Sequence, residues 1–475
     1  MRGLIAIALL LSFSAGCTVG PKYKRPALQP PLNYYTEQAT SDHSVADLAW
    51  WDLFKDPTLQ ALIREALKNN YDLQLALARV EQERALLGTT HSQYYPQVNY
   101  DASVSGAQAV LVPNHTYYGY NFSTFWEIDL FGRLRKLNEA QRAAYFSSEE
   151  ARRDVRLLVL AEVAQGYFQL RALDEQLAIA HRTVESFQVT LDLFQKKLEG
   201  GASSGLEVAR AQGALSNVAA AIPNFERQIV AQENALDLLL GRNPGPIVRG
   251  AALIDQYDPP DVPVGLPATL LERRPDLREA EQNLIAANAN VGVAKANFFP
   301  TLSLTGSFGG LSPQLSELTG TGKAWSLAGD LAGPLFTAGR LKNEYRASLA
   351  LRDQARVSFE KAVTQAFGEV STALSAHQQL ASAYRQQLSS VDAYRESVRL
   401  SSVRYDSGLA SYFEIVDAQI QLYPAESSAV TFELGQKLAL VDLYRALGGG
   451  WNLDDSQWTI AGVAPSGTRT PAVTH

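Results

Sequence analysis

The chain has 475 residues, of which 46% are apolar and 19% are charged, and its net charge is −7. This composition is that of a folded protein, and the mildly acidic balance provides no basic surface for a nucleic-acid partner. The six histidines are scattered without metal-ligand spacing, so the sequence predicts no metal site.

The N-terminus, "MRGLIAIALLLSFSAGC", carries one positive charge at Arg2, an apolar run over 4–13 and small residues before Cys17. This pattern is typical of an export signal, and the apolar run is too short to span a membrane. Cys17 is the only cysteine, and its position resembles that of the lipidation cysteine of bacterial lipoproteins. We therefore expect a signal peptide at 1–16 and a lipid on Cys17, with an ordinary cleaved signal peptide as the alternative. Thr18 after the cysteine favours delivery to the outer membrane.

Most of the remaining chain is a tandem repeat. The stretch "NNYDLQLALARV" at 69–80 aligns with "RRPDLREAEQNL" at 273–284, and Pro96 matches Pro300 at the same offset. The repeats are placed at 57–240 and 268–447. A proline-rich linker at 241–267 separates them, and the segments 17–56 and 448–475 flank them.

Each repeat predicts the same series of elements: a short helix, two strands, a long helix, a turn and a returning helix. In the first repeat these are a helix at 72–93, strands at about 97–108 and 117–130, a long helix at 132–199 and a returning helix at 206–240. In the second repeat they are a helix at 276–297, strands at about 301–309 and 324–336, a long helix at 339–407 and a returning helix at 411–447.

The predicted strands alternate, as in "YGYNFSTFWEIDL" at 118–130, where mostly apolar or aromatic residues interleave with mostly small or polar ones. Their lengths are close to the roughly 9–11 residues with which a tilted strand crosses a bilayer. The aromatic residues fit a wall that faces lipid. Half of a soluble β-sandwich is the alternative.

The long helices are the second strong pattern. No proline occurs between Gly132 and Gly200, and apolar residues recur at steps of three and four from Leu170 to Leu198. Such a seam predicts coiled-coil packing, and about 68 residues of helix extend for roughly 100 Å. The returning helix covers only about half of that length, so the short helix is expected to cover the rest. Pro223 and Pro424 should bend the returning helices.

Four strands are too few to close a membrane barrel with a useful lumen, and open strand edges in lipid would leave backbone amides without partners. The chain is therefore expected to oligomerise. Three copies would supply twelve strands above a ring of helices.

Several stretches resemble the outer-membrane efflux factors of the TolC/OprM family, in its lipoprotein (NodT-like) branch: "GCTVGPKYKRP", "WWDLFKDPTLQALI", the duplicated aromatic-Pro before the strands, and "LVDLYRALGGGWN". The resemblance implies an α+β membrane channel, a homotrimer with a twelve-stranded outer-membrane β-barrel continuous with a long coiled-coil α-helical barrel. It places the segments 17–56, 241–267 and 448–475 at the equator of that α-barrel. It also implies a periplasmic membrane-fusion adaptor, an inner-membrane pump of the RND type, and export of drugs or other small toxic compounds.

Within this resemblance, "LEGGASSGLEVARAQ" at 198–212 and "YDSGLASYFEIVDAQ" at 405–419 are the two hairpin tips at the periplasmic end. The glycines allow the positive φ of a tight turn between helices. The hypothesised adaptor contacts are Gly201, Ala202, Ser203, Ser204, Gly408, Leu409, Ala410 and Ser411. Plain turn chemistry is the alternative for these residues.

The second tip alone carries Asp417, which aligns with Arg210 of the first. The resemblance implies that this acidic residue, with Tyr405 nearby, lines the constricted inner end of the channel as a gate. Three symmetric carboxylates would repel one another and need partners to stay closed. Ile420 stands where the family often has an arginine. A carboxylate on a solvated helix face is the alternative.

Motifs of enzymes are absent from the sequence. There is no P-loop, dinucleotide fingerprint or H-E-x-x-H, and "GASSG" at 201–205 follows a helix rather than the strand that a nucleophile elbow needs. The prediction is a non-enzyme without cofactors, anchored in the outer membrane through Cys17 and extending into the periplasm. A protein-secretion duct of the same fold, and a lipid-anchored coiled-coil scaffold without a pore, are the alternatives.

Overall fold

The computed structural model describes residues 18–27, 44–109, 112–256, 263, 269–320, 322–450 and 458, so Cys17 lies outside the described residues. The chain forms two compact units. The first contains Leu77–Ala151, Asp276–Ala362 and the N-terminal segment up to Leu28; the second contains Gln29–Ala76, Arg152–Pro275 and Val363–His475. None of the helices in the described ranges is both long and apolar enough to cross a membrane.

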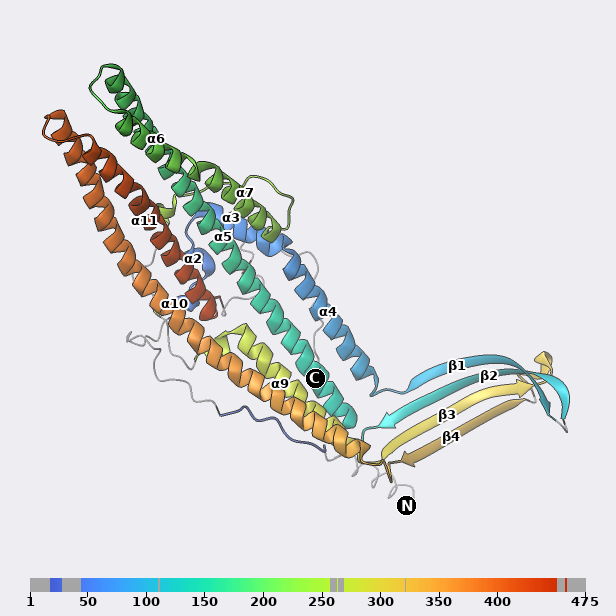
Figure 1. The fold of residues 1–475 in the computed structure, drawn as a ribbon. Helices are drawn as coiled ribbons and strands as arrows, with labels where there is room; N and C mark the ends of the chain where they lie inside the picture. The colour runs from blue at the N-terminus through green and yellow to red at the C-terminus, as the bar shows by residue number, and fades with distance from the viewer. Residues whose placement is uncertain are drawn as a thin grey trace. The chain divides into compact units, whose positions relative to one another are not determined.

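The helices and strands follow the same order in both repeats (Figure 1). The first half contains α2 (Trp50–Leu53), α3 (Pro57–Asn69), α4 (Tyr71–Ser92), β1 (Gln97–Ala109), β2 (Val112–Ile128), α5 (Arg133–Glu199), α6 (Gly205–Ala219) and α7 (Ala221–Leu239). The second contains α8 (Leu270–Arg273), α9 (Pro275–Ala296), β3 (Thr301–Ser312), β4 (Lys323–Ala332), α10 (Arg340–Asp406) and α11 (Phe413–Ala446). The described residues also form the 3₁₀ turns η1 (Val45–Asp47), η2 (Leu253–Asp255) and η4 (Leu315–Glu317).

The returning helix of the first repeat differs from the single helix expected at 206–240. It is interrupted at Ala220, so that α6 and α7 are separate helices. Pro223 lies in the first turn of α7, where its missing N–H costs no hydrogen bond, and this is why the helix restarts there. Pro424, in contrast, lies inside the unbroken α11.

The strand boundaries also differ from expectation. β2 begins at Val112 rather than at 117, and β3 continues to Ser312 rather than ending at 309. The strand expected at 324–336 ends at Ala332, just before Gly333-Pro334, because proline cannot donate a hydrogen bond to a neighbouring strand.

The four strands form one antiparallel sheet in the order β1-β2-β3-β4 (Figure 1). The register brings Tyr100 opposite Phe122, Phe122 opposite Phe308, and Phe308 opposite Trp325. Residues directly opposite one another share a face of a sheet, so these four aromatic residues form a row across it. This face of the sheet is mostly apolar, with Thr124, Ser312 and Lys323 as polar exceptions.

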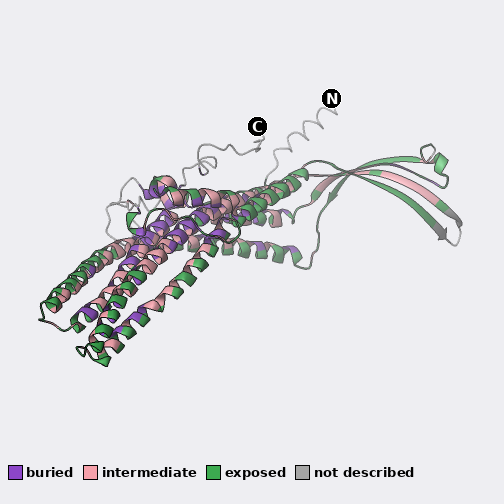
Figure 2. Cartoon of the chain, turned by 90° about the horizontal axis from the view of Figure 1, so that it is seen from above, coloured by how far each residue is buried: buried purple, intermediate pink, exposed green. Residues whose placement is uncertain are grey.

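The side chains of this apolar face are uncovered in the single chain. Tyr100 is 82% exposed and Trp325 is 78% exposed, and Figure 2 shows the strands mainly in the colours of exposed and half-buried residues. Exposed large side chains of the same face are Val98, Tyr100, Val104, Phe122, Phe308, Trp325, Leu327 and Leu331.

The opposite face of the sheet is mostly polar. Along it lie Asn99, Asp101, Asn121, Ser123, Ser307, Ser326 and Asp330, together with the apolar Phe125 and Leu311. The hydroxyls of Ser307 and Ser326 lie 2.8 Å apart, and Thr305 donates to Asp330 at 3.3 Å. The alternation of the sequence thus separates an apolar from a polar face.

In the first unit, the N-terminal segment is fixed along α9 and the start of α5. The N–H of Val19 donates to the carbonyl of Phe131 at 3.1 Å, and Asn288 donates to the carbonyl of Pro21 at 3.2 Å. Further along, Tyr23 and Arg25 both bind Glu281. These contacts place Thr18, the residue after Cys17, beside the junction of β2 and α5.

The core of the second unit forms where Trp50 of α2 packs among the longer helices. Trp50, Leu59, Tyr167, Leu236 and Tyr444 are almost completely buried in one cluster, which draws on α2, α3, α5, α7 and α11. A second cluster forms from the predicted heptad seam: Ala180, Phe187, Leu191 and Phe194 of α5 pack against Ala211, Leu215 and Val218 of α6. Apolar side chains at three- and four-residue steps meet a partner helix, as a coiled-coil seam requires.

A buried polar network joins Asp56, the residue before α3, to α5 and to the linker of this unit. Asp56 accepts hydrogen bonds from Tyr167 at 2.8 Å and from Gln256 at 2.7 Å. The hydroxyl of Tyr167 accepts from the N–H of Gly250 at 2.8 Å. Lys437 of α11 donates to the carbonyl of Gln256 at 2.9 Å. Segments far apart in the sequence are therefore tied to one carboxylate.

The duplication is visible in how each returning helix ends. Asn70 donates to the carbonyl of Leu239 at 2.9 Å, and Arg274 donates to that of Ala446 at 2.9 Å. Gly241 and Gly448, which follow these helices, have φ of 69° and 73°. Both repeats satisfy the free carbonyls at a helix C-terminus in the same way, although the donors are different residues.

Candidate functional site

The first hairpin tip is a tight turn between α5 and α6. Gly201 has φ of 73°, and the N–H of Ala202 donates to the carbonyl of Lys197 at 2.7 Å. Ser204 then caps α6, since its N–H donates to Glu207 at 2.9 Å and its hydroxyl accepts from the Glu207 N–H at 3.4 Å. This reciprocal pair is a capping box.

Hydrogen bonds at this tip also stabilise the ionised carboxylate of Glu207. The hydroxyl of Ser203 donates to Glu207 at 2.7 Å. This bond and the one from the Ser204 N–H lower the pKa of the Glu207 carboxyl. Glu207 therefore stays ionised at the N-terminus of α6, where negative charge is favoured.

The second tip repeats this geometry without a side-chain cap. Gly408 has φ of 73°, and the N–H of Leu409 donates to the carbonyl of Arg404 at 2.9 Å. Arg404 also reaches Glu414 of α11 at 3.2 Å. Leu409 is 71% exposed, and Ser411 is exposed as well.

The predicted adaptor contacts lie together at these two turns. Six of the eight are exposed and two are half-buried: Gly201, Ala202, Ser204, Gly408, Leu409 and Ser411 are exposed, and Ser203 and Ala410 are half-buried. Backbone hydrogen bonds hold both turns, and the hydroxyls of Ser203 and Ser204 also bond to Glu207.

The two predicted gate residues lie differently. Asp417 is exposed on α11, next to the buried Val416 and Ala418, and takes part in none of the ion pairs found among the described residues. Tyr405 is half-buried and packs against Tyr412 and Lys197. No interaction between Asp417 and Tyr405 is found in the described part of the chain.

A residue that sequence reasoning missed lies between the hairpins. The ring of Tyr412 meets that of Phe194 at 4.8 Å and that of Tyr405 at 4.7 Å, both edge to face. Its hydroxyl lies 3.0 Å from that of Thr190. The only signal in the sequence is an aromatic residue directly before α11, which by itself indicates no partner.

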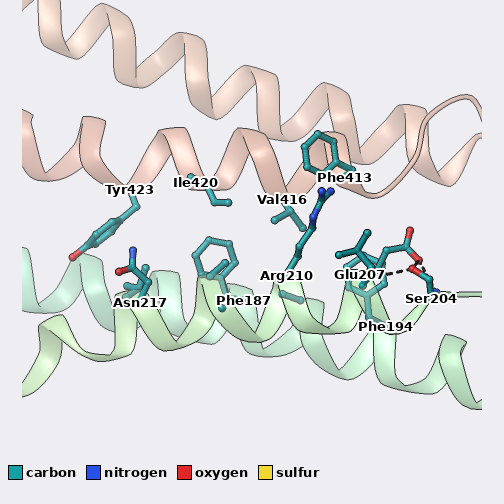
Figure 3. A pocket seen from close by; sticks show the side chains of 15 residues that line it. Phe187, Phe194, Ser204, Glu207, Arg210, Asn217, Phe413, Val416, Ile420 and Tyr423 are labelled. Carbon is teal, nitrogen blue, oxygen red and sulfur yellow. Dashed lines mark hydrogen bonds between the residues drawn. The ribbon is translucent and has the colours of Figure 1, made fainter.

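A cavity of about 680 Å³ separates the hairpins next to these contacts (Figure 3). Phe413, Val416, Ile420 and Tyr423 project into it from α11. Phe187 of α5 and Arg210 and Asn217 of α6 face them. The guanidinium of Arg210 lies 5.2 Å from the centre of the Phe413 ring, so the residue that aligns with Asp417 binds an aromatic face and not a carboxylate.

Across the described residues, no three His, Cys, Asp or Glu side chains are grouped so that they could hold a metal ion.

A family model described as outer membrane efflux protein matches the chain in two segments, residues 62–242 and 266–449. These segments nearly coincide with the repeats placed at 57–240 and 268–447. The chain belongs to the outer membrane efflux protein family. As a member it is an outer-membrane component of an efflux system.

Individual relatives agree with this efflux assignment. The probable outer membrane lipoprotein SilC of Salmonella typhimurium is 31% identical over 458 residues, which cover 94% of this chain and 98% of SilC. The toluene efflux pump outer membrane protein TtgC of Pseudomonas putida is 32% identical over 467 residues, covering 95% of this chain and 96% of TtgC.

The fold of the efflux protein is likewise that of known channels. It is similar to the open-state MtrE outer membrane channel of Neisseria gonorrhoeae, with a TM-score of 0.85 and 32% identity. The match covers 92% of this chain and 99% of MtrE.

Proposed function

We propose that three copies of the chain close a twelve-stranded barrel in the outer membrane, continuous with a periplasmic duct made by the long helices. The observation that carries this proposal is the sheet. Within it β1 and β4 each have one hydrogen-bonded neighbour, one face is apolar and exposed, and the other is polar. A sheet of this kind in lipid needs further copies at both edges, and its polar face suits a water-filled lumen.

The experiment is to measure the mass of the purified protein in detergent and its conductance in a planar lipid bilayer. The proposal expects a mass near three chains and discrete ion-conducting events. A coiled-coil scaffold without a pore would give no conductance at any voltage.

The cargo is proposed to be small toxic compounds, delivered by a periplasmic adaptor and an inner-membrane pump of the RND type. The relatives favour this cargo over secreted proteins, since TtgC is named as the outer membrane protein of a toluene efflux pump. Deletion of the gene should raise susceptibility to solvents, drugs or metal ions and leave the set of secreted proteins unchanged. Loss of secreted proteins with unchanged susceptibility would favour the secretion duct.

The exposed residues of both tips are proposed to contact the adaptor. Leu409→Asp should abolish resistance without affecting assembly, because a charge replaces a 71% exposed apolar side chain at the turn. Leu315→Asp is the matched control, since Leu315 is 65% exposed in the turn between β3 and β4. Normal resistance with Leu409→Asp would contradict a contact between this tip and the adaptor.

Asp417 and Tyr405 are proposed to line the closed inner end of the duct. Three Asp417 carboxylates around one axis would hinder tight closure unless other contacts hold it. Asp417→Ala should therefore change the closed-state conductance in a bilayer. An unchanged closed-state conductance would show that Asp417 is not part of the gate.

Cys17 is proposed to carry the lipid anchor. The support is the placement of Thr18 beside the junction of β2 and α5, where a strand that crosses the bilayer would end. Mass spectrometry of the N-terminal peptide should show an acylated cysteine beginning at residue 17, and an unmodified peptide would leave only the export signal.

A further inference from the structure

Contacts between the two hairpins converge on Tyr412, the residue before α11. Its ring packs edge to face on Phe194 of α5, with the planes at 82°, and on Tyr405 of α10, with the planes at 84°. Edge-to-face pairs place the positive ring edge on the negative face of the partner and are attractive beyond the area they bury. One side chain therefore joins α5 of the first hairpin to α10 of the second.

The contacts on the first hairpin follow one face of α5. Thr190, Phe194 and Lys197 are spaced by four and three residues, which places them on consecutive turns. Thr190 is 1% exposed and lies 3.0 Å from the Tyr412 hydroxyl, and the Lys197 ammonium lies 4.3 Å from the centre of the Tyr405 ring. One turn before Thr190, Ser186 accepts a hydrogen bond from Gln419 of α11 at 2.9 Å.

The same contact contains polar atoms that are not satisfied. The hydroxyl of Tyr405 and the side-chain oxygen of Gln419 are buried, and neither has a hydrogen-bond partner in the described chain. Buried polar atoms without partners are costly, and this cost disappears when water reaches them. The contact is thus held by aromatic rings and opposed by these two atoms, which suits an interface that must separate.

The acidic residue at this end offers no comparable contact. Asp417 is exposed, Ile420 is 46% exposed beside the cavity, and Arg210 rests on Phe413. Within the described subunit, the contacts that join the hairpins near their tips include those of Tyr412, the Lys197–Tyr405 and Arg210–Phe413 pairs, and the bond from Gln419 to Ser186. Asp417 takes part in none of them.

We infer that Tyr412 is the positioning residue of the gate, which holds the second-repeat hairpin against the first-repeat hairpin of the same subunit in the closed channel. The inference rests on the proposed channel and gate. It assigns closure to edge-to-face aromatic contacts inside each subunit, which would act against the repulsion among three Asp417 carboxylates.

The test is the open probability of the purified full-length channel in a planar bilayer without adaptor. Tyr412→Ala removes both ring pairs, so we expect the closed-to-open equilibrium to move about tenfold or more toward open. Tyr412→Phe keeps the rings and loses only the hydroxyl contact with Thr190, so we expect a smaller shift, up to about tenfold.

Tyr394→Ala is the matched control. Tyr394 packs on a cluster of Val391, Ala425 and Ala429, which lies wholly within the second hairpin. Loss of the Tyr394 ring weakens packing inside the second hairpin but leaves the contacts with the first hairpin in place. The open probability should therefore stay near that of the wild type. Equal opening by Tyr394→Ala, or wild-type behaviour of Tyr412→Ala, would overturn the inference.

A rescue experiment separates positioning from general stability. Ser186→Cys with Gln419→Cys, placed in the Tyr412→Ala background, allows the two hairpins to be joined by a short thiol crosslinker. Once mass spectrometry verifies the crosslink, closure should return, and a crosslinked channel that stays open would refute the role of Tyr412. If the wild-type protein forms no conducting channel in any condition, the proposed function fails instead.

Discussion

At the residue scale, the Asp56 network shows how one buried carboxylate organises distant segments. Burial raises the pKa of the Asp56 carboxyl, but the hydrogen bonds from Gln256, Tyr167 and the Thr58 N–H outweigh it, and the pKa is lowered overall. A carboxylate with a lowered pKa stabilises the fold above its unfolded value of about 4. That contribution is lost as the pH falls through the folded-state pKa.

Tyr167→Phe tests this network. The Gly250 N–H loses its acceptor and Asp56 loses a donor, so the free energy of unfolding at pH 7 should fall by about 1–3 kcal/mol. The further loss of stability between pH 7 and pH 3 should be smaller than in the wild type, because the Asp56 pKa is less lowered. Thermal unfolding in detergent, followed by circular dichroism, measures both.

The control for this substitution is Tyr145→Phe. The Tyr145 hydroxyl bonds to Glu149 on a half-buried helix face, where water can replace it. Its unfolding should stay close to that of the wild type at both pH values. Equal losses of stability from the two substitutions would mean that the network around Asp56 contributes no more to stability than the half-buried hydrogen bond of Tyr145.

At the element scale, the ends of the returning helices depend on glycine. Gly241 has φ of 69°, and a Cβ there would collide with the carbonyl oxygen of Asn69. Gly241→Ala should lower the free energy of unfolding by about 2 kcal/mol or more, from the backbone strain and the collision together. Gly245→Ala, where a Cβ meets nothing within 4 Å, should be nearly neutral in the same measurement.

The strands allow a sharper comparison, because neighbouring residues of β4 face opposite sides. Leu327 is 77% exposed on the apolar face, whereas Ser326 lies on the polar face. Leu327→Arg should destabilise the membrane-inserted protein by about 2–4 kcal/mol and reduce its recovery in outer-membrane fractions. Ser326→Arg should be recovered normally, and equal losses would contradict a lipid-facing apolar side.

At the scale of the whole molecule, the proposed trimer predicts how subunits interfere with one another. If Leu409→Asp chains are expressed equally with wild-type chains and mix at random, only about one channel in eight contains three wild-type subunits. Resistance should therefore fall well below the half expected of independent chains. A reduction to one half would indicate that each chain works alone.

The sequence by itself determined the features that depend on local periodicity and on turn chemistry. The predicted long helices at 132–199 and 339–407 differ by at most one residue at each end from α5 and α10. The period of two in the strands separated the two faces of the sheet, and the glycines at 201 and 408 marked both turns. These features are readable because each residue acts on neighbours within about one helical turn or one strand pair.

Only the tertiary structure decided the contacts between distant residues. Tyr412 meets Thr190 across 222 positions of sequence, and Tyr167 meets Asp56 across 111. The local sequence around either Tyr residue does not predict its partner. Which side chain each Tyr meets depends on how α5, α10 and α11 pack. The sequence also did not predict that the returning helix of the first repeat is interrupted at Ala220. Pro223 is compatible both with a bend inside one helix and with the first turn of a new helix. Periodicity fixes the faces that elements present, and packing fixes which side chains meet across them.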